Sequence, residues 1–278
     1  LKEDNDEEDP DLRAFTYEEI NYFIQNTYTR IELKKILISS PYNFYIFLFA
    51  LLIGCRLRET GLAAMNDIKV QEVDGVNHYY IYLNANQPYQ NLKNANAYRN
   101  IPIPDLLIEL GFLNYVHKRH KFNAETLYQL SPKSGAEGFG SFYKRHIAKL
   151  FPNNADTREN RRLGEMKTFV QLRSLRKNFS TFLFNENRTS FDTEINKKKI
   201  FGHESEGATS GYYERLEPSI SSTIINAIDF QEKINFSEIR DIVSEFYGEI
   251  ITELPWLKEI KEEWRIKGKI KSSKGRKV

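Results

Sequence analysis

The chain has 278 residues, of which 40% are hydrophobic and 28% are charged, and its formal net charge is +2. These fractions are ordinary for a soluble globular protein and predict one large domain with an appendage. Cys55 is the only cysteine, which excludes an internal disulfide and a cysteine-rich metal site. No signal peptide is visible, and the longest apolar run, Phe44–Ile53, is too short to span a bilayer.

The small net charge hides an asymmetry between the two ends of the chain. Seven acidic residues lie between Glu3 and Asp11, and seven basic residues lie between Arg265 and Lys277. The body between them is near neutral, so the overall charge is a poor guide to nucleic-acid binding. We interpret residues 1–13 as an acidic linker that is disordered by composition. Because the chain opens on Leu1 rather than Met, we expect that a preceding domain has been removed.

Three helices are predicted before the first candidate site residue. Thr16-Tyr-Glu-Glu19 has the pattern of a capping box, which opens a helix that ends near Asn26. A second helix follows at about Ile31–Ile38. Ser40-Pro41 then starts a third helix, Tyr42–Ile53, which is apolar on nearly all sides and is therefore expected to be buried at the centre.

The central helix leads into Gly54-Cys-Arg56-Leu-Arg-Glu59, and a short helix is predicted at Glu59–Met65. A pair of ordinary surface arginines is the plain interpretation of this stretch. Its flanks are unusually apolar, however, and a charge so close to a core needs an anionic partner. Glu59 could be that partner for Arg56, or it could orient Arg56 toward a ligand.

A β region follows. Ile68–Val73 and Val76–Leu83 are predicted to form a hairpin around the turn Asp74-Gly75, and a third strand is predicted at Tyr98–Ile103. Between the second and third strands lies a polar loop, Gln87–Ala97, which contains Lys93. Taken alone, Lys93 would be a solvated loop lysine.

The pattern then returns to helices, which we place at Asp105–His117, Ser141–Phe151, Gln171–Asn185 and Phe191–Ile200. The second of these carries Lys144 and Arg145 among aromatic residues, which suits a phosphate backbone, although an ordinary amphipathic helix fits equally well. The third helix carries Arg173, Arg176 and Lys177 on or near one edge.

Residues 218–278 are predicted to form a helical extension with a basic tail. Ile224, Ile225 and Ile228 recur at helical spacing, and Asn235-Phe-Ser-Glu238 has the pattern of a cap that opens a helix reaching Ile250. Leu254-Pro255-Trp256 would close that helix. Its apolar stripe must be buried either within the chain or on a neighbouring subunit.

Taken together, these segments resemble the catalytic domain of the tyrosine recombinases, the integrase family of phages and mobile elements, from about Phe15 to Glu214. Gly54-Cys-Arg56-Leu-Arg-Glu59 is similar to the first arginine motif of the family, with Arg56 as the catalytic arginine and Glu59 as its supporting acid. Lys93 falls in the hairpin loop where the family keeps its catalytic lysine.

The later motifs occur in the order of the same family. Arg173-Ser-Leu-Arg176 is similar to the His-x-x-Arg signature, and Phe201-Gly-His203 is similar to the Leu-Gly-His box. Tyr212 follows His203 by nine residues, the usual offset of the nucleophile, which makes Tyr213 the weaker candidate. Arg173 departs from the family pattern, which has His at that position. Some members carry Lys or Arg there, so this departure does not imply an inactive site.

The resemblance implies a role for each residue in cutting a DNA phosphodiester. Arg56 and Arg176 would clamp the non-bridging oxygens, where negative charge builds up during the attack. Tyr212 would attack the phosphorus, with His203 accepting or positioning its proton, and Lys93 would protonate the departing 5′ oxygen. The covalent 3′-phosphotyrosine conserves the bond energy, so neither a metal nor a cofactor is implied.

The predicted fold class is α+β, mostly helical, with a small three-stranded antiparallel sheet as in the recombinase catalytic domain. We expect a catalytic domain at 14–217, a missing DNA-binding domain before it, and the extension at 218–278. The implied partners are double-stranded attachment-site DNA and further copies of the chain. These would form a tetramer on DNA through exchange of C-terminal helices, in a prokaryotic or phage-encoded protein of the cytoplasmic nucleoid.

Two alternatives remain open. One is a related enzyme, a type IB topoisomerase or a hairpin telomere resolvase, although the short spacing from Arg176 to Tyr212 favours an integrase. The other is a DNA-binding or assembly module with a decayed site, which Arg173 motivates. The sequence does not specify the DNA site, the direction of recombination, the accessory factors, the host element, or whether Tyr212 acts in its own or a neighbouring active site.

Overall fold

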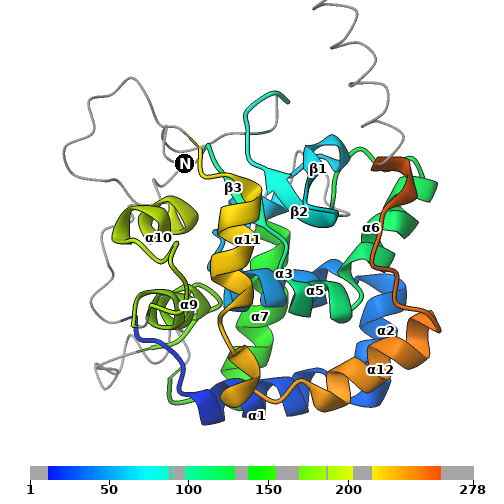
Figure 1. Cartoon of the computed structure of the whole chain (residues 1–278). Helices are drawn as coiled ribbons and strands as arrows, with labels where there is room; N and C mark the ends of the chain where they lie inside the picture. The colour runs from blue at the N-terminus through cyan, green and yellow to red at the C-terminus, as the bar shows by residue number, and fades with distance from the viewer. Residues whose placement is uncertain are drawn as a thin grey trace, which may run out of the picture.

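The computed structural model of the chain describes residues 12–87, 90, 98–128, 137–154, 169–185, 187–202 and 215–257. The described part is mostly helical and contains one three-stranded antiparallel sheet, so the predicted α+β class is confirmed (Figure 1). No single helix of the described part is long and apolar enough to cross a membrane. The helices Arg30–Ser39 and Tyr42–Ile53, bent by 106° to one another, together meet the criteria of length and composition.

The described residues from 12 to 102 supply four α-helices, a 3₁₀ turn and the sheet. They are α1 (Tyr17–Thr27), α2 (Arg30–Ser39), α3 (Tyr42–Ile53), α4 (Leu57–Gly61), η1 (Met65–Asp67), β1 (Ile68–Val73), β2 (Val76–Tyr82) and β3 (Asn100–Pro102). The later elements are α5 (Asp105–Glu109), α6 (Phe112–Lys121), α7 (Glu137–Leu150), α9 (Ser174–Phe184), α10 (Glu194–Phe201), α11 (Pro218–Asn226), η3 (Phe230–Glu232) and α12 (Ser237–Tyr247).

Helix α3 is the centre of the core, as its composition predicts. Every residue of α3 after Tyr42 is buried, and aromatic side chains from neighbouring helices pack around it. Phe47 stacks on Phe23 of α1 with 5.2 Å between the ring centroids, and Tyr45 stacks on Tyr115 of α6 with 5.0 Å between theirs. Gly54 ends the helix in the left-handed conformation (φ +63°), which turns the chain toward Arg56.

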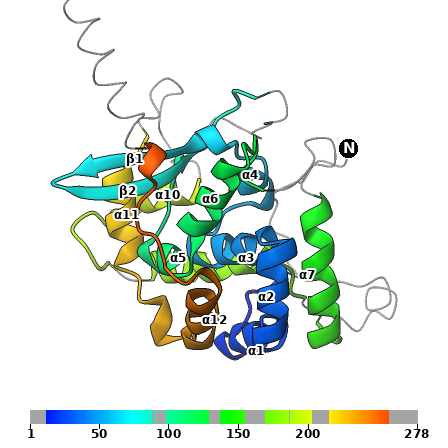
Figure 2. The same ribbon diagram turned by 90° about the vertical axis from the view of Figure 1, so that its right-hand side faces the viewer.

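The predicted hairpin and its turn are confirmed. Strands β1 and β2 pair antiparallel from Ile68↔Ile81 to Val73↔Val76, and both Asp74 (φ +49°) and Gly75 (φ +80°) have the positive φ of a tight hairpin turn. Strand β3 pairs with β2 and is shorter than predicted. The hairpin projects from the body, and α7 lies at the opposite edge (Figure 2).

Two of the helices predicted between residues 59 and 117 are wrong in their extent. The helix predicted at Asp105–His117 is broken into α5 and α6 at Gly111 (φ +77°), where a Cβ would lie 2.8 Å from side-chain atoms of Val243 and Tyr247. The helix predicted at Glu59–Met65 instead ends at Gly61. A separate 3₁₀ turn follows, because the Asp67 carboxylate accepts the Ala64 amide at 2.7 Å.

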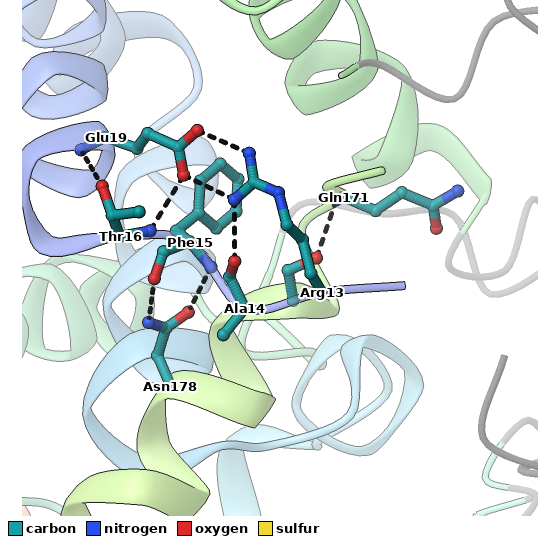
Figure 3. Close-up of polar contacts among 8 residues, drawn as sticks. Arg13, Ala14, Phe15, Thr16, Glu19, Gln171 and Asn178 are labelled. Atoms are coloured by element: carbon teal, nitrogen blue, oxygen red, sulfur yellow. Dashed lines mark hydrogen bonds and ion pairs between the residues drawn. The ribbon is translucent and has the colours of Figure 1, made fainter. Parts of the chain in front are cut away.

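The capping box at the start of α1 is confirmed and also holds the preceding segment (Figure 3). Thr16 and Glu19 exchange the two predicted bonds, and Glu19 also accepts two bonds from the Arg13 guanidinium at 2.6 and 2.7 Å. Leu12 is buried and forms a parallel bridge with Phe169. The predicted disorder is therefore wrong for Leu12 and Arg13, while residues 1–11 lie outside the described part.

The C-terminal helices pack within the chain. Helix α11 lies across the sheet and contacts all three strands, and α12 lies along α2 (Figure 1). Helix α12 ends at Tyr247 rather than at Ile250, because Gly248 (φ +75°) turns the chain away. The Tyr247 hydroxyl lies 3.2 Å from that of Tyr45 in α3. The apolar stripe of α12 is thus buried in cis, and exchange of helices between subunits stays a prediction.

Candidate functional site

Seven of the predicted site residues lie in the described part of the chain: Arg56, Glu59, Lys144, Arg145, Arg173, Arg176 and Lys177. The other predicted residues, Lys93, His203, Tyr212 and its alternative Tyr213, lie outside it. The structure brings three of the described residues together with a fourth residue, Arg99. We call Arg56, Glu59, Arg99 and Arg176 the arginine cluster.

Glu59 is the centre of the arginine cluster, and its carboxylate accepts four hydrogen bonds. Arg56 donates to it twice, from the backbone amide at 2.9 Å and from Nη1 at 3.0 Å. Arg99 donates twice more, from Nη1 to Oε1 at 3.0 Å and from Nη2 to Oε2 at 2.7 Å. Four bonds fill the acceptor capacity of a carboxylate. Glu59 is therefore the ionic partner that the apolar flanks of Arg56 require.

Arg99 was not predicted as a site residue. It precedes β3, its side chain is 6% exposed, and its Nε donates to the Ile200 carbonyl at 3.2 Å. The same reasoning that singled out Arg56 applies to it, because Arg99 lies two residues before the apolar run Ile101–Ile103 and a charge there needs a partner. The sequence could thus have identified Arg99 as a buried charge. It could not have identified Glu59 as the partner, because the two residues are 40 positions apart.

Arg176 joins the arginine cluster from α9. Its Nη1 donates to the Gly54 carbonyl at the end of α3, and its Nη2 donates to the Phe201 carbonyl at the end of α10 at 2.8 Å. The guanidinium carbon lies 3.8 Å from the centre of the Phe201 ring, a cation–π distance. Gly54 permits this approach of α9 to α3, because a Cβ there would lie 2.4 Å from Phe179 of α9.

The arginine cluster contains three guanidinium groups and one carboxylate, and the pKa values reflect this imbalance. Burial raises the pKa of Glu59, but the charges and hydrogen bonds of Arg99 and Arg56 outweigh burial and lower the pKa to about 2. Burial and the nearby charge of Arg56 lower the pKa of Arg176 to about 10. A depressed arginine pKa means that the charged form is disfavoured where it lies. A bound anion would relieve this cost.

The end of α10 leads directly to residue 203 and is held by two arginines of the cluster. Arg99 donates a hydrogen bond to the Ile200 carbonyl, and Arg176 donates one to the adjacent Phe201 carbonyl. Gly202 follows with φ +79°, and a Cβ there would lie 2.8 Å from Arg99 Nη1. The turn before His203 is therefore fixed to the arginine cluster, although His203 itself lies outside the described residues.

A second buried network fixes the beginning of the loop that carries Lys93. Asp67 accepts bonds from Asn84 Nδ2 at 2.7 Å and from Gln90 Nε2 at 2.6 Å, in addition to the Ala64 amide. Gln90 Nε2 also donates to the Leu62 carbonyl at 3.2 Å. The loop is thus anchored three residues before Lys93, beside the end of α4.

The remaining predicted residues lie at the start of α9 and on α7. Arg173 is the exposed N-cap residue of α9, one turn before Arg176. Lys177 donates to the Leu12 carbonyl at 2.6 Å, so it holds the N-terminal segment. Lys144 and Arg145 are exposed on α7, which packs against α1.

Asn178 is a structural residue of α9 that the sequence did not single out. Its side chain accepts from the Phe15 amide at 3.0 Å and donates to the Phe15 carbonyl at 2.7 Å, so it pairs with this backbone as a neighbouring strand would (Figure 3). The pairing is buried. It fixes α9, and with it Arg176, to the segment that enters α1.

Within the described residues, no group of three or more His, Cys, Asp or Glu side chains could hold a metal ion. The chain matches no protein-family model, no curated protein and no solved structure, which leaves the geometry of the arginine cluster as the ground for a functional proposal.

Proposed function

We propose that this protein is a site-specific DNA recombinase of the tyrosine type, which cuts and rejoins DNA strands through a covalent 3′-phosphotyrosine. One observation carries the proposal. Arg56 and Arg176, which are 120 residues apart in the sequence, both belong to a partly buried cluster whose positive charge exceeds its negative charge among the described residues. A phosphodiester is an anion that two guanidinium groups bind well, since each offers paired N–H donors to phosphate oxygens.

The order of the motifs supports the chemistry of this proposal. In it, Tyr212 attacks the phosphorus, and the bond to the 5′ oxygen breaks as Lys93 protonates that oxygen. Arg56 and Arg176 stabilise the charge that develops on the non-bridging oxygens, and removal of one such donor typically costs ~2.7–4 kcal/mol. His203 takes or positions the tyrosine proton. The turn that delivers His203 is tied to Arg99 and Arg176, which suits a role beside the arginines.

The wider proposal is integration or excision of a mobile element by a tetramer on double-stranded attachment-site DNA, in the nucleoid of a prokaryotic cytoplasm. Lys144 and Arg145 would contact the phosphate backbone, since both are exposed on α7. Lys177 is a weaker candidate for DNA contact, because its amine is bonded to the Leu12 carbonyl.

The test is a covalent-trapping experiment with a suicide DNA that is nicked near a candidate attachment site. Wild type, Tyr212→Phe and Tyr213→Phe are compared on a denaturing gel, with Arg176→Lys as a variant that keeps the charge but loses the two-pronged geometry. We expect an adduct that disappears only with Tyr212→Phe and weakens with Arg176→Lys. Loss only with Tyr213→Phe would move the nucleophile by one residue.

The same experiment separates the alternatives. DNA binding without an adduct on any site would favour the DNA-binding or assembly module, for which the exposed Arg173 at the signature histidine position is the motivating observation. An adduct accompanied by relaxation of a supercoiled plasmid, without exchange between two DNAs, would favour the type IB topoisomerase.

A further inference from the structure

Arg99 is more deeply buried than the arginine that the sequence identified. Its side chain is 6% exposed, whereas that of Arg56 is 24% exposed, and Glu59 between them is 5% exposed. Arg99 therefore has little access to a ligand, while Arg56 lies at the open side of the same carboxylate. Both arginines bond Glu59, but only Arg56 is exposed enough to contact a ligand as well, so the two residues have different roles.

The contacts of Arg99 connect three elements. Its two Nη atoms hold both oxygens of Glu59 in α4, its Nε holds the Ile200 carbonyl at the end of α10, and its backbone leads into β3. Gly202 packs directly against the guanidinium, because a side chain there would collide with Nη1 and the guanidinium carbon at 2.8 and 2.9 Å. Every nitrogen of this guanidinium is therefore committed to a protein acceptor.

Such a buried ion pair needs an explanation other than stability. Removing two charges from water is costly, and an apolar pair of similar volume is often at least as stable. What the pair does provide is orientation. Arg99 occupies one acceptor site on each oxygen of Glu59, and Arg56 donates to the remaining sites through Nη1 and its backbone amide. Without Arg99, the carboxylate would attract the Arg56 guanidinium into a closer, two-pronged contact.

We infer that Arg99 is a positioning residue that keeps Glu59 occupied, so that the Arg56 guanidinium stays directed toward a bound phosphate group, and that anchors the end of α10 beside it. The phosphodiester as natural ligand rests on the proposed function, whereas the effect of Arg99 on Arg56 does not. Arg99 itself makes no contact with the ligand.

The test measures binding of inorganic phosphate by NMR of protein labelled with ¹⁵N-arginine, following the Nε–Hε signals. The variants are Arg99→Met, Arg99→Lys, Glu59→Gln and the double variant Glu59→Gln/Arg99→Met, with strand transfer on nicked DNA as a separate readout. We expect Arg99→Met to shift the Arg56 signal before phosphate is added and to weaken phosphate binding about tenfold. For strand transfer, we expect a loss smaller than the ~10²–10³-fold fall in kcat that is typical when a direct oxyanion donor is removed.

Arg99→Lys should recover part of the affinity, since a lysine restores the charge without the paired geometry. Because Arg99 acts through Glu59, the losses of the two single variants should not add in the double variant. An unchanged Arg56 signal and unchanged phosphate affinity in a folded Arg99→Met protein would overturn the inference, and so would additive losses. If Arg99→Met does not fold, Arg99→Lys and the double variant test the inference instead. The double variant should fold more readily, because it leaves no unpaired carboxylate buried.

The readouts keep the two proposals apart. If no variant, wild type included, forms an adduct with DNA, the recombinase proposal fails, while the Arg56 signal still tests the role of Arg99. If adducts form normally in Arg99→Met and phosphate binding is intact, the inference fails and the recombinase proposal stands.

Discussion

Gly202→Ala tests how tightly the end of α10 is packed against the arginine cluster. Gly202 has φ +79°, where an alanine costs about 1–2 kcal/mol. Its Cβ would also lie 2.8 Å from Arg99 Nη1, so the guanidinium would have to move. Loss of one hydrogen bond between buried charged groups costs about 1.5–3 kcal/mol. We therefore expect Gly202→Ala to lower the free energy of unfolding by about 2.5–5 kcal/mol, measured by urea denaturation followed by circular dichroism.

Gly75 provides a matched control for this substitution. It has nearly the same φ, +80°, but no atom lies within 4 Å of the position that a Cβ would occupy. Gly75→Ala should therefore show the backbone cost alone, about 1–2 kcal/mol. The difference between the two variants isolates the contact with Arg99. Equal destabilisation of the two variants would refute the close packing of Gly202 on Arg99.

Three further predictions concern other parts of the structure. Asn178→Ala should lower the free energy of unfolding by about 2–4 kcal/mol in urea denaturation, because the buried amide and carbonyl of Phe15 lose their partner. The folded-state pKa of Glu59 is lowered from 4.5 to about 2, so its stabilising contribution is complete above pH 4.5 and is lost as the pH falls toward 2. A Glu59→Gln protein should accordingly show a flatter loss of stability over that range in acid titration. The double variant Lys144→Gln/Arg145→Gln should keep its stability, since both side chains are exposed, and should lower the salt slope of DNA binding by about 2 in a fluorescence-anisotropy titration.

The sequence predicted the parts of the fold whose signals are local. The capping box of Thr16 and Glu19, the Asp74-Gly75 hairpin and the buried helix α3 all depend on neighbours within a few residues, and the structure confirms each. Gly111 shows the limit of such signals. Its helical flanks predict one continuous helix, but the chain breaks there at φ +77°. Val243 and Tyr247, more than 130 residues later, pack so closely on Gly111 that they leave no room for a Cβ.

The candidate site likewise combines a contact that a local pattern predicts with contacts between residues far apart in the sequence. Arg56 and Glu59 are three residues apart, so their pairing could be anticipated from the sequence and is present in the structure. Arg99 bonds Glu59 across 40 residues and Ile200 across 101. Its role depends on which acceptors the folded chain brings to it, which no local pattern records. Asn178 likewise meets the Phe15 backbone across 163 residues.

The way Arg176 is held explains how the site can be both rigid and positively charged. Its Nη1 and Nη2 donate to the carbonyls of Gly54 and Phe201, at the ends of helices α3 and α10. A helix C-terminus carries a partial negative charge of roughly half an elementary charge, which attracts a guanidinium but does not neutralise it as a carboxylate would. Burial and the charge of Arg56 therefore still lower the pKa of Arg176 to about 10. Glu59, already fully bonded by Arg56 and Arg99, has no acceptor site left to offer Arg176. The helix ends thus fix the direction of the guanidinium while most of its charge remains for an anion to neutralise.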